Sequence, residues 1–237
     1  ELIVLQETHV PNAVAGHSLG EFSSLVANNS ISFEDGLKLV FLRAKAMQKS
    51  CENSNGTMAA ILGLDDKIIK ETCESFDGNV TAANFNCPGQ VVISGELNAV
   101  KMICEKFNEI GARRSILLPV GGAFHSNLMN DAKSELKEAI HKTKFNNPTC
   151  PIYQNFTAQK TTSIDIIKEN LINQLTAPVL WTQTINNMVN DGYLDYTEVG
   201  PGKVLQGLIK KVNREVSTES ALGLSLIHIS EPTRPSR

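Results

Sequence analysis

The sequence lacks the patterns that mark several classes of protein. Its five cysteines are odd in number and no two form a C-x-x-C pair, which argues against a disulfide framework or a zinc site. No apolar run approaches the roughly 20 residues that a membrane-spanning helix needs, and no stretch has the form of a signal peptide. The net charge of -3 gives no general attraction to nucleic acid or to an anionic membrane. These absences predict a cytoplasmic protein with no metal, nucleic acid or membrane partner.

The chain is long enough, at 237 residues with 41% hydrophobic, to bury a sizeable core. Between residues 56 and 120 the hydrophobic periodicity predicts strands at 57–62, 79–84, 90–94 and 113–118, and helices at 65–76 and 97–110. Their order, β-α-β-β-α-β, is typical of a ferredoxin-like unit. Pro88 and Gly89 give the turn between its two central strands.

Helices and strands also alternate outside this unit. Helices are predicted from Ser32 to about Ser50 and at 128–141, 164–175, 181–190 and 203–216, with strands at 152–156 and 194–199. This alternation predicts a mainly parallel α/β layer. The expected fold class is therefore α/β, with a large subdomain at 1–55 and 121–222 and an inserted ferredoxin-like (βαββαβ) subdomain at 56–120.

One short stretch specifies both backbone geometry and chemistry. Residues 16–20 read Gly-His-Ser-Leu-Gly, the G-x-S-x-G of an α/β-hydrolase-like nucleophile elbow, between an apolar segment and a helix-forming one. The elbow presents Ser18 on a strained turn, and the flanking glycines let neighbouring backbone approach. The amide of Leu19, at the positive end of the following helix, is the expected oxyanion donor. The alternative for Ser18 is a helix-capping serine, which explains the hydroxyl but not the glycines.

A serine nucleophile needs a base, and the chain has five histidines. His9 lies in a polar segment, and His17 is expected to point away from the nucleophile. His141 lies among lysines on a solvated face, and His228 is near the chain end. His125 remains, in a glycine-containing loop of the kind that often carries function, with a helix-start histidine satisfied by backbone as its alternative. No acidic residue marks a third triad member, so a backbone carbonyl is expected to orient the imidazole.

The helix that follows Ser32 carries a charged residue in apolar surroundings. It is apolar almost all round, which predicts that it is buried. Arg43 shares a face with Val40 and Met47, and a buried guanidinium needs an anion. Arg43 is therefore either salt-bridged within the core or bound to an anionic substrate.

Five motifs, in this order, resemble those of the malonyl-CoA:acyl carrier protein transacylases and the related acyltransferase domains of fatty-acid and polyketide synthases. They are GHSLGE at 16–21, LRAKAMQ at 42–48, NFNCPGQVVISG at 84–95, GAFHS at 122–126 and EVGPGK at 198–203. The resemblance extends over nearly everything from Val14 to Leu208. Several motifs that agree in order and spacing are far more specific than one elbow.

The resemblance implies an acyl transfer without a bound cofactor. In it Ser18 takes malonyl from malonyl-CoA and passes it to the phosphopantetheine thiol of an acyl carrier protein by a ping-pong mechanism, with His125 as base and then as acid. A monomer is expected.

The resemblance also assigns four binding or positioning residues. Arg43 matches the arginine that pairs with the malonyl carboxylate, and Asn86 matches an asparagine that lines the site. The carbonyl of Leu180 falls where the family orients its histidine. Phe124, directly before His125, resembles the malonyl-type pattern.

Both ends of the chain depart from the family. The family begins with a strand and a Phe-Pro-Gly-Gln-Gly-Ser-Gln loop, whose first glutamine is a second oxyanion donor, and this sequence has neither. Residues 224–234 look like the translation of a sequencing adapter. We therefore expect a chain truncated before residue 1 and a non-native tail at 223–237.

Other functions stay open at this point. A serine esterase or hydrolase shares the elbow and the histidine, but it releases its acyl group to water and does not need Arg43. An acyltransferase domain of a polyketide synthase shares all the motifs. A non-catalytic subunit that binds a carrier protein through the small insert would not depend on Ser18.

Overall fold

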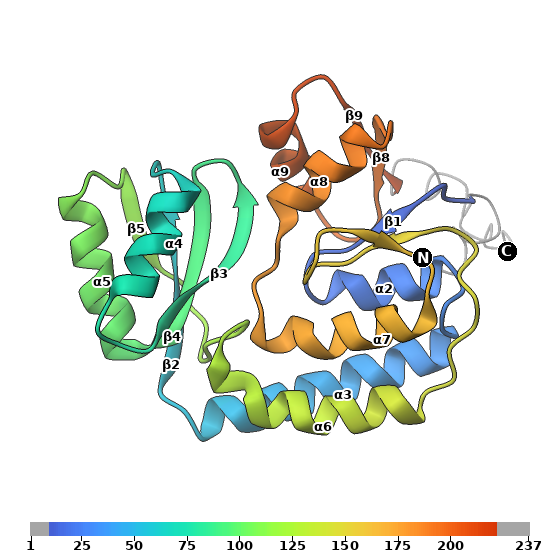
Figure 1. Ribbon diagram of the computed structural model, residues 1–237, viewed down its shortest axis with the longest axis horizontal. Coiled ribbons are helices and arrows are strands. Elements are labelled where there is room, and N and C mark those ends of the chain that lie inside the picture. The colour runs from blue at the N-terminus through green and yellow to red at the C-terminus, as the bar shows by residue number, and fades with distance from the viewer. Residues whose placement is uncertain (1–9, 222–237) are drawn as a thin grey trace, which may run out of the picture.

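The computed structural model describes residues 10–221, which form two α/β parts side by side (Figure 1). The small part occupies the left of the figure and the large part the right. The α/β class predicted from the sequence is confirmed. His9, His228 and the predicted non-native tail at 223–237 lie outside the described residues.

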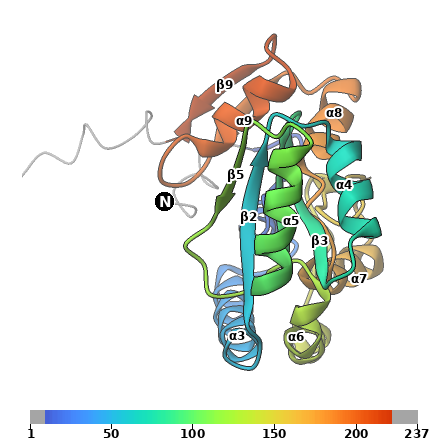
Figure 2. The same cartoon turned by 90° about the vertical axis from the view of Figure 1, so that its left-hand side faces the viewer.

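The small part is a four-stranded sheet with two helices on one face (Figure 2). Its elements are β2 (Gly56–Leu62), α4 (Asp66–Ser75), β3 (Val80–Cys87), β4 (Gln90–Glu96), α5 (Leu97–Glu109) and β5 (Arg114–Leu117). Neighbouring strands are antiparallel in the order β3-β4-β2-β5, which is the order of a split βαβ unit. Ile61, Ile93 and Phe107 are fully buried between the sheet and the helices.

The large part combines helices with two short sheets. Its helices are α2 (Gly20–Ala27), α3 (Phe33–Glu52), α6 (Asn130–Lys142), α7 (Ile164–Asn173), α8 (Trp181–Asn190) and α9 (Val204–Val212), with short 3-10 helices η1 (Asn127–Met129) and η2 (Gln174–Thr176). Its strands are β1 (Val14–Ala15), β6 (Ile152–Tyr153), β7 (Lys160–Thr161), β8 (Asp195–Glu198) and β9 (Ser217–Ser220). Within residues 10–221 the predicted parallel layer consists of two parallel pairs, β1 with β6 and β8 with β9, while β7 joins β6 antiparallel.

Two predicted elements end clearly earlier than expected. The strand predicted at 152–156 ends at Tyr153, because the next residues turn away and the backbone amide of Asn155 donates to a side chain instead of a strand. The helix predicted at 203–216 ends at Val212. There the side chain of Asn213 accepts a hydrogen bond from the amide of Glu215, a local turn that competes with helix, and β9 follows.

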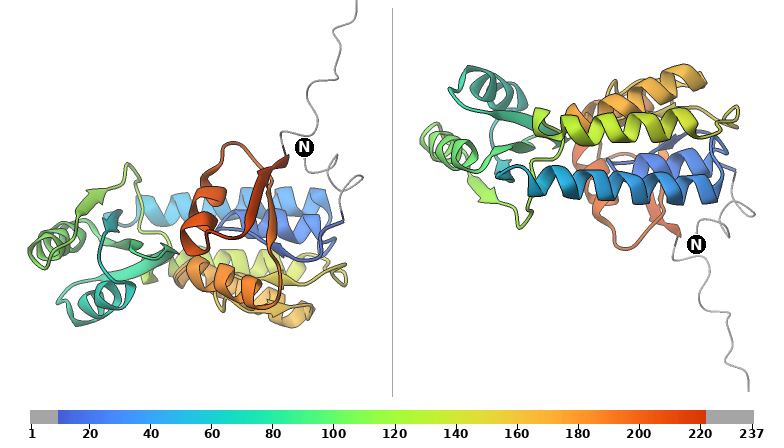
Figure 3. Two further views of the ribbon diagram at one scale, coloured as in Figure 1. Left: turned by 90° about the horizontal axis from the view of Figure 1, so that it is seen from above. Right: turned by 90° about the horizontal axis from the view of Figure 1, so that it is seen from below.

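The prediction that the helix after Ser32 is buried is wrong for one of its faces. This helix, α3, lies beside α6 along one side of the molecule (Figure 3). Leu39, Arg43 and Met47 are buried, whereas Phe41 is 67% exposed. α3 has apolar residues on all of its faces, but the neighbouring elements cover only some of these faces.

Backbone hydrogen bonds join the two parts. The amide of Phe85 in β3 donates to the carbonyl of Val179 at 2.9 Å, and the amide of Val179 donates to the carbonyl of Ala83 at 2.8 Å. One parallel bridge, between Asn84 and Val179, thereby joins β3 to the segment before α8. This junction brings the end of β3 close to the turn between β1 and α2.

Among the helices of residues 10–221, none has the length and apolar character to cross a membrane.

Candidate active site

Ser18 lies in a tight turn between β1 and α2. Its φ is 51°, a left-handed conformation that costs a non-glycine residue on the order of 1 kcal/mol or more. Two hydrogen bonds close the turn, from the amide of Gly20 to the carbonyl of His17 and from the amide of Glu21 to the carbonyl of Ser18, at 3.0 and 3.1 Å. The serine hydroxyl is thus presented at the start of α2.

The two glycines of the elbow differ in their need for a missing side chain. A Cβ on Gly16 would lie 2.1 Å from the carbonyl carbon of Gly20, so Gly16 is required where the strand meets the helix. A Cβ on Gly20 would meet no atom within 4 Å. The expectation that both glycines permit close backbone approach therefore holds for Gly16 and is wrong for Gly20.

Ser18 and His125 form a hydrogen-bonded pair although they are 107 residues apart, with 2.8 Å between Oγ and Nε2. His125 Nδ1 lies 2.9 Å from the carbonyl oxygen of Gln174. Nδ1 must donate to this carbonyl, which leaves Nε2 unprotonated and able to accept the serine proton. Burial, together with the nearby charge of Arg43, lowers the pKa of His125 to about 4. The imidazole is therefore neutral at pH 7, the form that a base needs.

The residue that orients His125 is not the predicted one. The carbonyl of Leu180 was expected in this role, but it accepts a hydrogen bond from the amide of Thr184 at 2.9 Å, which opens α8. A carbonyl at the start of a helix is used by that helix, whereas one at the end of a helix is left over. Gln174, directly after α7, supplies such a carbonyl, because within η2 it accepts only a long hydrogen bond of 3.5 Å from the amide of Ala177.

Arg43 lies in the same cluster. Its Nη2 donates to Ser18 Oγ at 3.0 Å and approaches Gln174 Oε1 at 3.5 Å. The guanidinium is buried, and its Nε has no hydrogen-bond partner within the described part of the chain. Burial lowers the pKa of Arg43 to about 10, so it stays charged at pH 7. No ion pair between described residues involves Arg43, so the expected alternative of a core salt bridge is not seen there.

A cavity of about 440 Å³ opens onto these groups, at the junction of the two parts. Its lining includes the predicted site residues Ser18, Arg43, Phe124 and His125. Asn86 does not line it, and this prediction needs correction. The cavity wall on β3 is Asn84, while Asn86 lies behind His17 and accepts a hydrogen bond from its Nε2 at 2.8 Å.

The backbone amides of the elbow are used unequally. The Ser18 amide donates to the side-chain oxygen of Asn155 at 2.6 Å. The Leu19 amide has no hydrogen-bond partner among residues 10–221. At the start of a helix such an amide can donate to a developing oxyanion. The role of Leu19 as oxyanion donor stays a prediction.

Sequence reasoning missed His17 and Gln174. His17 was expected to point away from the site, but the residue contributes to the cavity lining. Its ring is hydrogen-bonded to Asn86 and lies edge-on to Trp181 at 5.6 Å between centroids. Burial lowers the pKa of His17, so it too is neutral. Gln174 carried no signal, because it lay within a predicted helix. The position of His17 inside the elbow motif was the one available hint.

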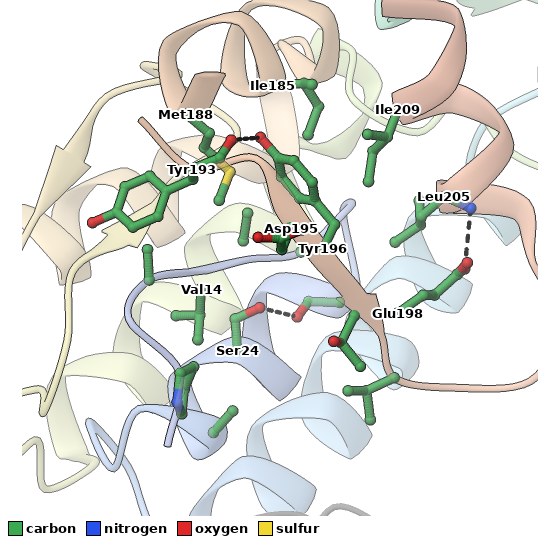
Figure 4. Close-up of a pocket in the computed structure, with 18 of the residues that line it drawn as sticks. Val14, Ser24, Ile185, Met188, Tyr193, Asp195, Tyr196, Glu198, Leu205 and Ile209 are labelled. Carbon is green, nitrogen blue, oxygen red and sulfur yellow. Dashed lines mark hydrogen bonds between the residues drawn. The ribbon is translucent and has the colours of Figure 1, made fainter. Parts of the chain in front are cut away.

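A second cavity, of about 430 Å³, lies on the other side of the elbow, between β1 and β8 (Figure 4). Ile185, Met188 and Tyr196 give it an apolar lining. Glu198 at its edge accepts hydrogen bonds from the amides of Leu205 and Gln206, at 3.0 and 3.1 Å, so it stabilises the start of α9. This cavity holds no nucleophile-base pair among its lining residues. Within residues 10–221 no cluster of His, Cys, Asp or Glu is arranged to hold a metal ion.

Comparison with known proteins agrees with this geometry. The sequence pattern of the acyl transferase domain family matches residues 8–226. The malonyl CoA-acyl carrier protein transacylase of Bacillus subtilis (strain 168) is 43% identical over 211 residues, which are 88% of this chain and 67% of that protein.

Solved structures give the same result. An acyl carrier protein S-malonyltransferase from Vibrio cholerae O1 has a TM-score of 0.89 at 38% identity, over 92% of this chain and 73% of that one. A type II PKS malonyl-transacylase, solved in complex with its acyl-carrier protein, has a TM-score of 0.87 at 36% identity, over 93% of this chain and 72% of that one. The resemblance predicted from the motifs is confirmed. The chain is an acyltransferase that belongs to the acyl transferase domain family, with malonyl CoA-acyl carrier protein transacylases among its relatives.

Proposed function

We propose that this acyltransferase transfers malonyl from malonyl-CoA to the phosphopantetheine thiol of an acyl carrier protein in fatty acid biosynthesis. In the first half-reaction Ser18 Oγ attacks the thioester carbonyl while His125 Nε2 takes the hydroxyl proton. The C–S bond breaks, and coenzyme A leaves with that proton. In the second half-reaction the carrier thiol gives its proton to His125 and attacks the malonyl-serine ester. Ser18 departs with the proton, and the malonyl group is again a thioester.

The buried guanidinium of Arg43 is the observation that supports malonyl as the acyl group. It lies within hydrogen-bond distance of the nucleophile and keeps its charge at pH 7, and its Nε has no partner among residues 10–221. Among residues 10–221 the Glu21 carboxyl acts on this cation only as a nearby charge and forms no ion pair with it, and a buried cation without a directly bound anion is unfavourable. A substrate carboxylate would satisfy it through a planar two-bond contact.

The remaining site residues take roles that follow from their positions. The Leu19 amide stabilises the tetrahedral oxyanion. Phe124, with Met47 and Met58, forms the apolar part of the cavity around the short acyl chain. Asn86 acts through His17, whose ring it fixes by accepting a hydrogen bond.

Two other functions are separated by their products. A serine esterase uses the same pair but releases free malonate, and the buried cation beside Ser18 favours transfer of an anionic acyl group over general ester hydrolysis. The similarity to a type II PKS malonyl-transacylase supports a second candidate, in which the acceptor is a polyketide carrier protein. Malonyl transfer rates to fatty-acid and polyketide carriers, measured side by side, distinguish these two acceptors.

We further propose a cytoplasmic monomer without a bound cofactor. The free state of all five cysteines supports a reducing compartment. The proposed domain division, 1–55 with 121–222 and 56–120, agrees with the separate cores of the large and small parts. Sedimentation of the purified protein tests the monomer.

Mass spectrometry of the acyl-enzyme tests the proposed function. Mixed with malonyl-CoA, the protein should gain one malonyl group on Ser18, and addition of a holo-carrier protein should remove it as malonyl-carrier. The adduct should be absent from Ser18→Ala. An adduct on another residue, or hydrolysis of the adduct with no transfer to a carrier, would refute the proposal.

A further inference from the structure

The strained elbow is held by a side chain from a distant part of the sequence. Asn155, which follows β6, accepts the Ser18 amide on Oδ1 and donates from Nδ2 to the carbonyl of Gly16, both at 2.6 Å. An amide can only donate and a carbonyl can only accept, so these two partners fix the orientation of the Asn155 carboxamide. The side chain therefore spans the turn on both sides of His17.

The pairing of β1 with β6 brings Asn155 to this place. Ala15 lies opposite Tyr153 in the parallel register, so the residues that follow each strand leave the sheet at the same end. Asn155 is fully buried, and its carbonyl accepts the amide of Leu180 at 3.0 Å. The backbone around the carboxamide is therefore fixed as well.

Glu21 holds Asn155 from the other side. It lies in the first turn of α2, fully buried, and its Oε2 accepts the backbone amide of Asn155 at 2.8 Å. Its Oε1 accepts Gln154 Nε2 at 3.0 Å, and Gln154 in turn accepts a hydrogen bond from Asn170. Burial raises the pKa of the Glu21 carboxyl, and the bonds from Asn155 and Gln154 oppose this rise. The Glu21 carboxyl also interacts with the Gln174 side chain and with the charge of Arg43, but its two hydrogen bonds at 2.8 and 3.0 Å lead to the segment of Asn155, which contacts the Ser18 amide directly.

We propose that Asn155 is the positioning residue that holds Ser18 in its reactive conformation, with Glu21 acting through it; this rests on the proposed role of Ser18 as nucleophile. The left-handed backbone of Ser18 needs support from its surroundings, because such strain persists only where neighbouring structure determines it. The Asn155 side chain supplies that support at the Ser18 amide itself. Because the Ser18 amide donates to Asn155, the first amide of the elbow that has no partner among residues 10–221 is that of Leu19.

The test measures the reactivity of Ser18 without any acyl substrate. A fluorophosphonate reacts with serine nucleophiles: the Oγ–P bond forms, the P–F bond breaks, fluoride leaves, and the base takes the proton. The labelling rate of Ser18 and the thermal midpoint are measured for the wild type, Asn155→Ala and Asn28→Ala. Asn28 is a matched control, fully buried, with a donor bond to Cys150 O and acceptor bonds from Ser30, but away from the elbow.

Both alanine variants should melt at lower temperature than the wild type. Asn155→Ala should label about 10²-fold more slowly while still folded, since a displacement of about 1 Å at a reacting atom can have an effect of this size. Asn28→Ala should stay within about twofold of the wild type. Equal labelling of Asn155→Ala and the wild type would overturn the proposal.

Asn155→Asp keeps the test decisive if the alanine variant does not fold. Aspartate retains the acceptor for the Ser18 amide but places an oxygen against the Gly16 carbonyl, so slow labelling is expected again, and wild-type labelling would refute the role. Glu21→Ala should slow labelling, and Glu21→Ala combined with Asn155→Ala should be no slower than Asn155→Ala alone. Multiplied losses would show that Glu21 does not act through Asn155.

The outcome is separable from that of the proposed function. Normal labelling of Ser18 without malonyl transfer would refute the transfer reaction and leave the role of Asn155 standing. A wild-type protein that is not labelled at Ser18 would overturn both.

Discussion

Replacement of Arg43 by alanine gives a test whose magnitude can be worked from the site. A carboxylate held by two charge-assisted hydrogen bonds gains about 1.5 to 3 kcal/mol from each. Part of this is offset, because Arg43 Nη2 already donates to Ser18 Oγ in the free protein. A net loss of about 3 kcal/mol corresponds to roughly a 10²-fold lower kcat/KM for malonyl-CoA. Acetyl-CoA has no second carboxylate, so its transfer should be unchanged or faster.

The informative quantity is the ratio of kcat/KM for malonyl-CoA to that for acetyl-CoA, measured by transfer to the same carrier protein. The ratio should fall by about 10²-fold in Arg43→Ala. Arg43→Lys should give an intermediate ratio, because an ammonium keeps the charge but not the planar two-bond contact. Thermal melting of each variant serves as the control for folding.

An equal loss of malonyl and acetyl transfer, with a lowered melting temperature, would show that Arg43 is structural and would refute the reasoning. The pH profile gives a second check. The charge of Arg43 contributes to the lowered pKa of His125. Removing that charge should therefore raise the pKa of His125 and move the acid limb of the rate profile to higher pH.

Three further results are expected. The acylation rate of Ser18 should fall only as pH drops toward about 4, where His125 becomes protonated, and a midpoint near 6.5 would contradict the burial argument. The unfolding free energy of the wild type minus that of His125→Asn should decrease as pH falls from about 6.5 to about 4, because only unfolded His125 binds a proton in this range. Chemical denaturation at several pH values measures this difference. The raised pKa of Glu21 acts in the opposite direction but cancels in this difference if it is the same in both proteins. Gly16→Ala should abolish activity and lower stability, whereas Gly20→Ala should melt at the same or higher temperature, since its Cβ meets nothing within 4 Å and alanine favours helix by about 1 kcal/mol; equal effects would refute the geometric distinction.

The parts of the fold that were predicted well carry their signal locally. The order of elements in the small part followed from hydrophobic periodicity and one turn, and each observed strand and helix lies within a few residues of its prediction. The helix predicted at 203–216 ends early because Asn213 forms a local turn with Glu215, and hydrophobic periodicity gives no sign of such a turn. The prediction that the helix after Ser32 is buried failed at Phe41 for a different reason. An apolar helix predicts burial only if other elements cover it, and that depends on the tertiary arrangement.

The site divides in the same way. Ser18 was predictable because a strained turn restricts the residues around it, and His125 because few histidines were available. Gln174 was not predictable, although it contacts every other member of the cluster. Its carbonyl accepts from His125, its Nε2 donates to the Ser18 carbonyl at 3.1 Å, and its Oε1 lies near Arg43.

Gln174 was not predictable because no pattern in the neighbouring sequence requires glutamine for any of these contacts. The carbonyl that orients His125 belongs to the backbone. It lies just after the end of α7 and otherwise accepts only the long 3.5 Å bond from the Ala177 amide, so any residue there would provide it. What glutamine adds is a carboxamide that can donate to the elbow and accept from Arg43 at once, in a fully buried position. Asn155 performs a similar task on the opposite side of Ser18. Two neutral carboxamides, from segments far from the elbow in sequence, thus hold the nucleophile between them without placing a negative charge beside a base that must stay neutral.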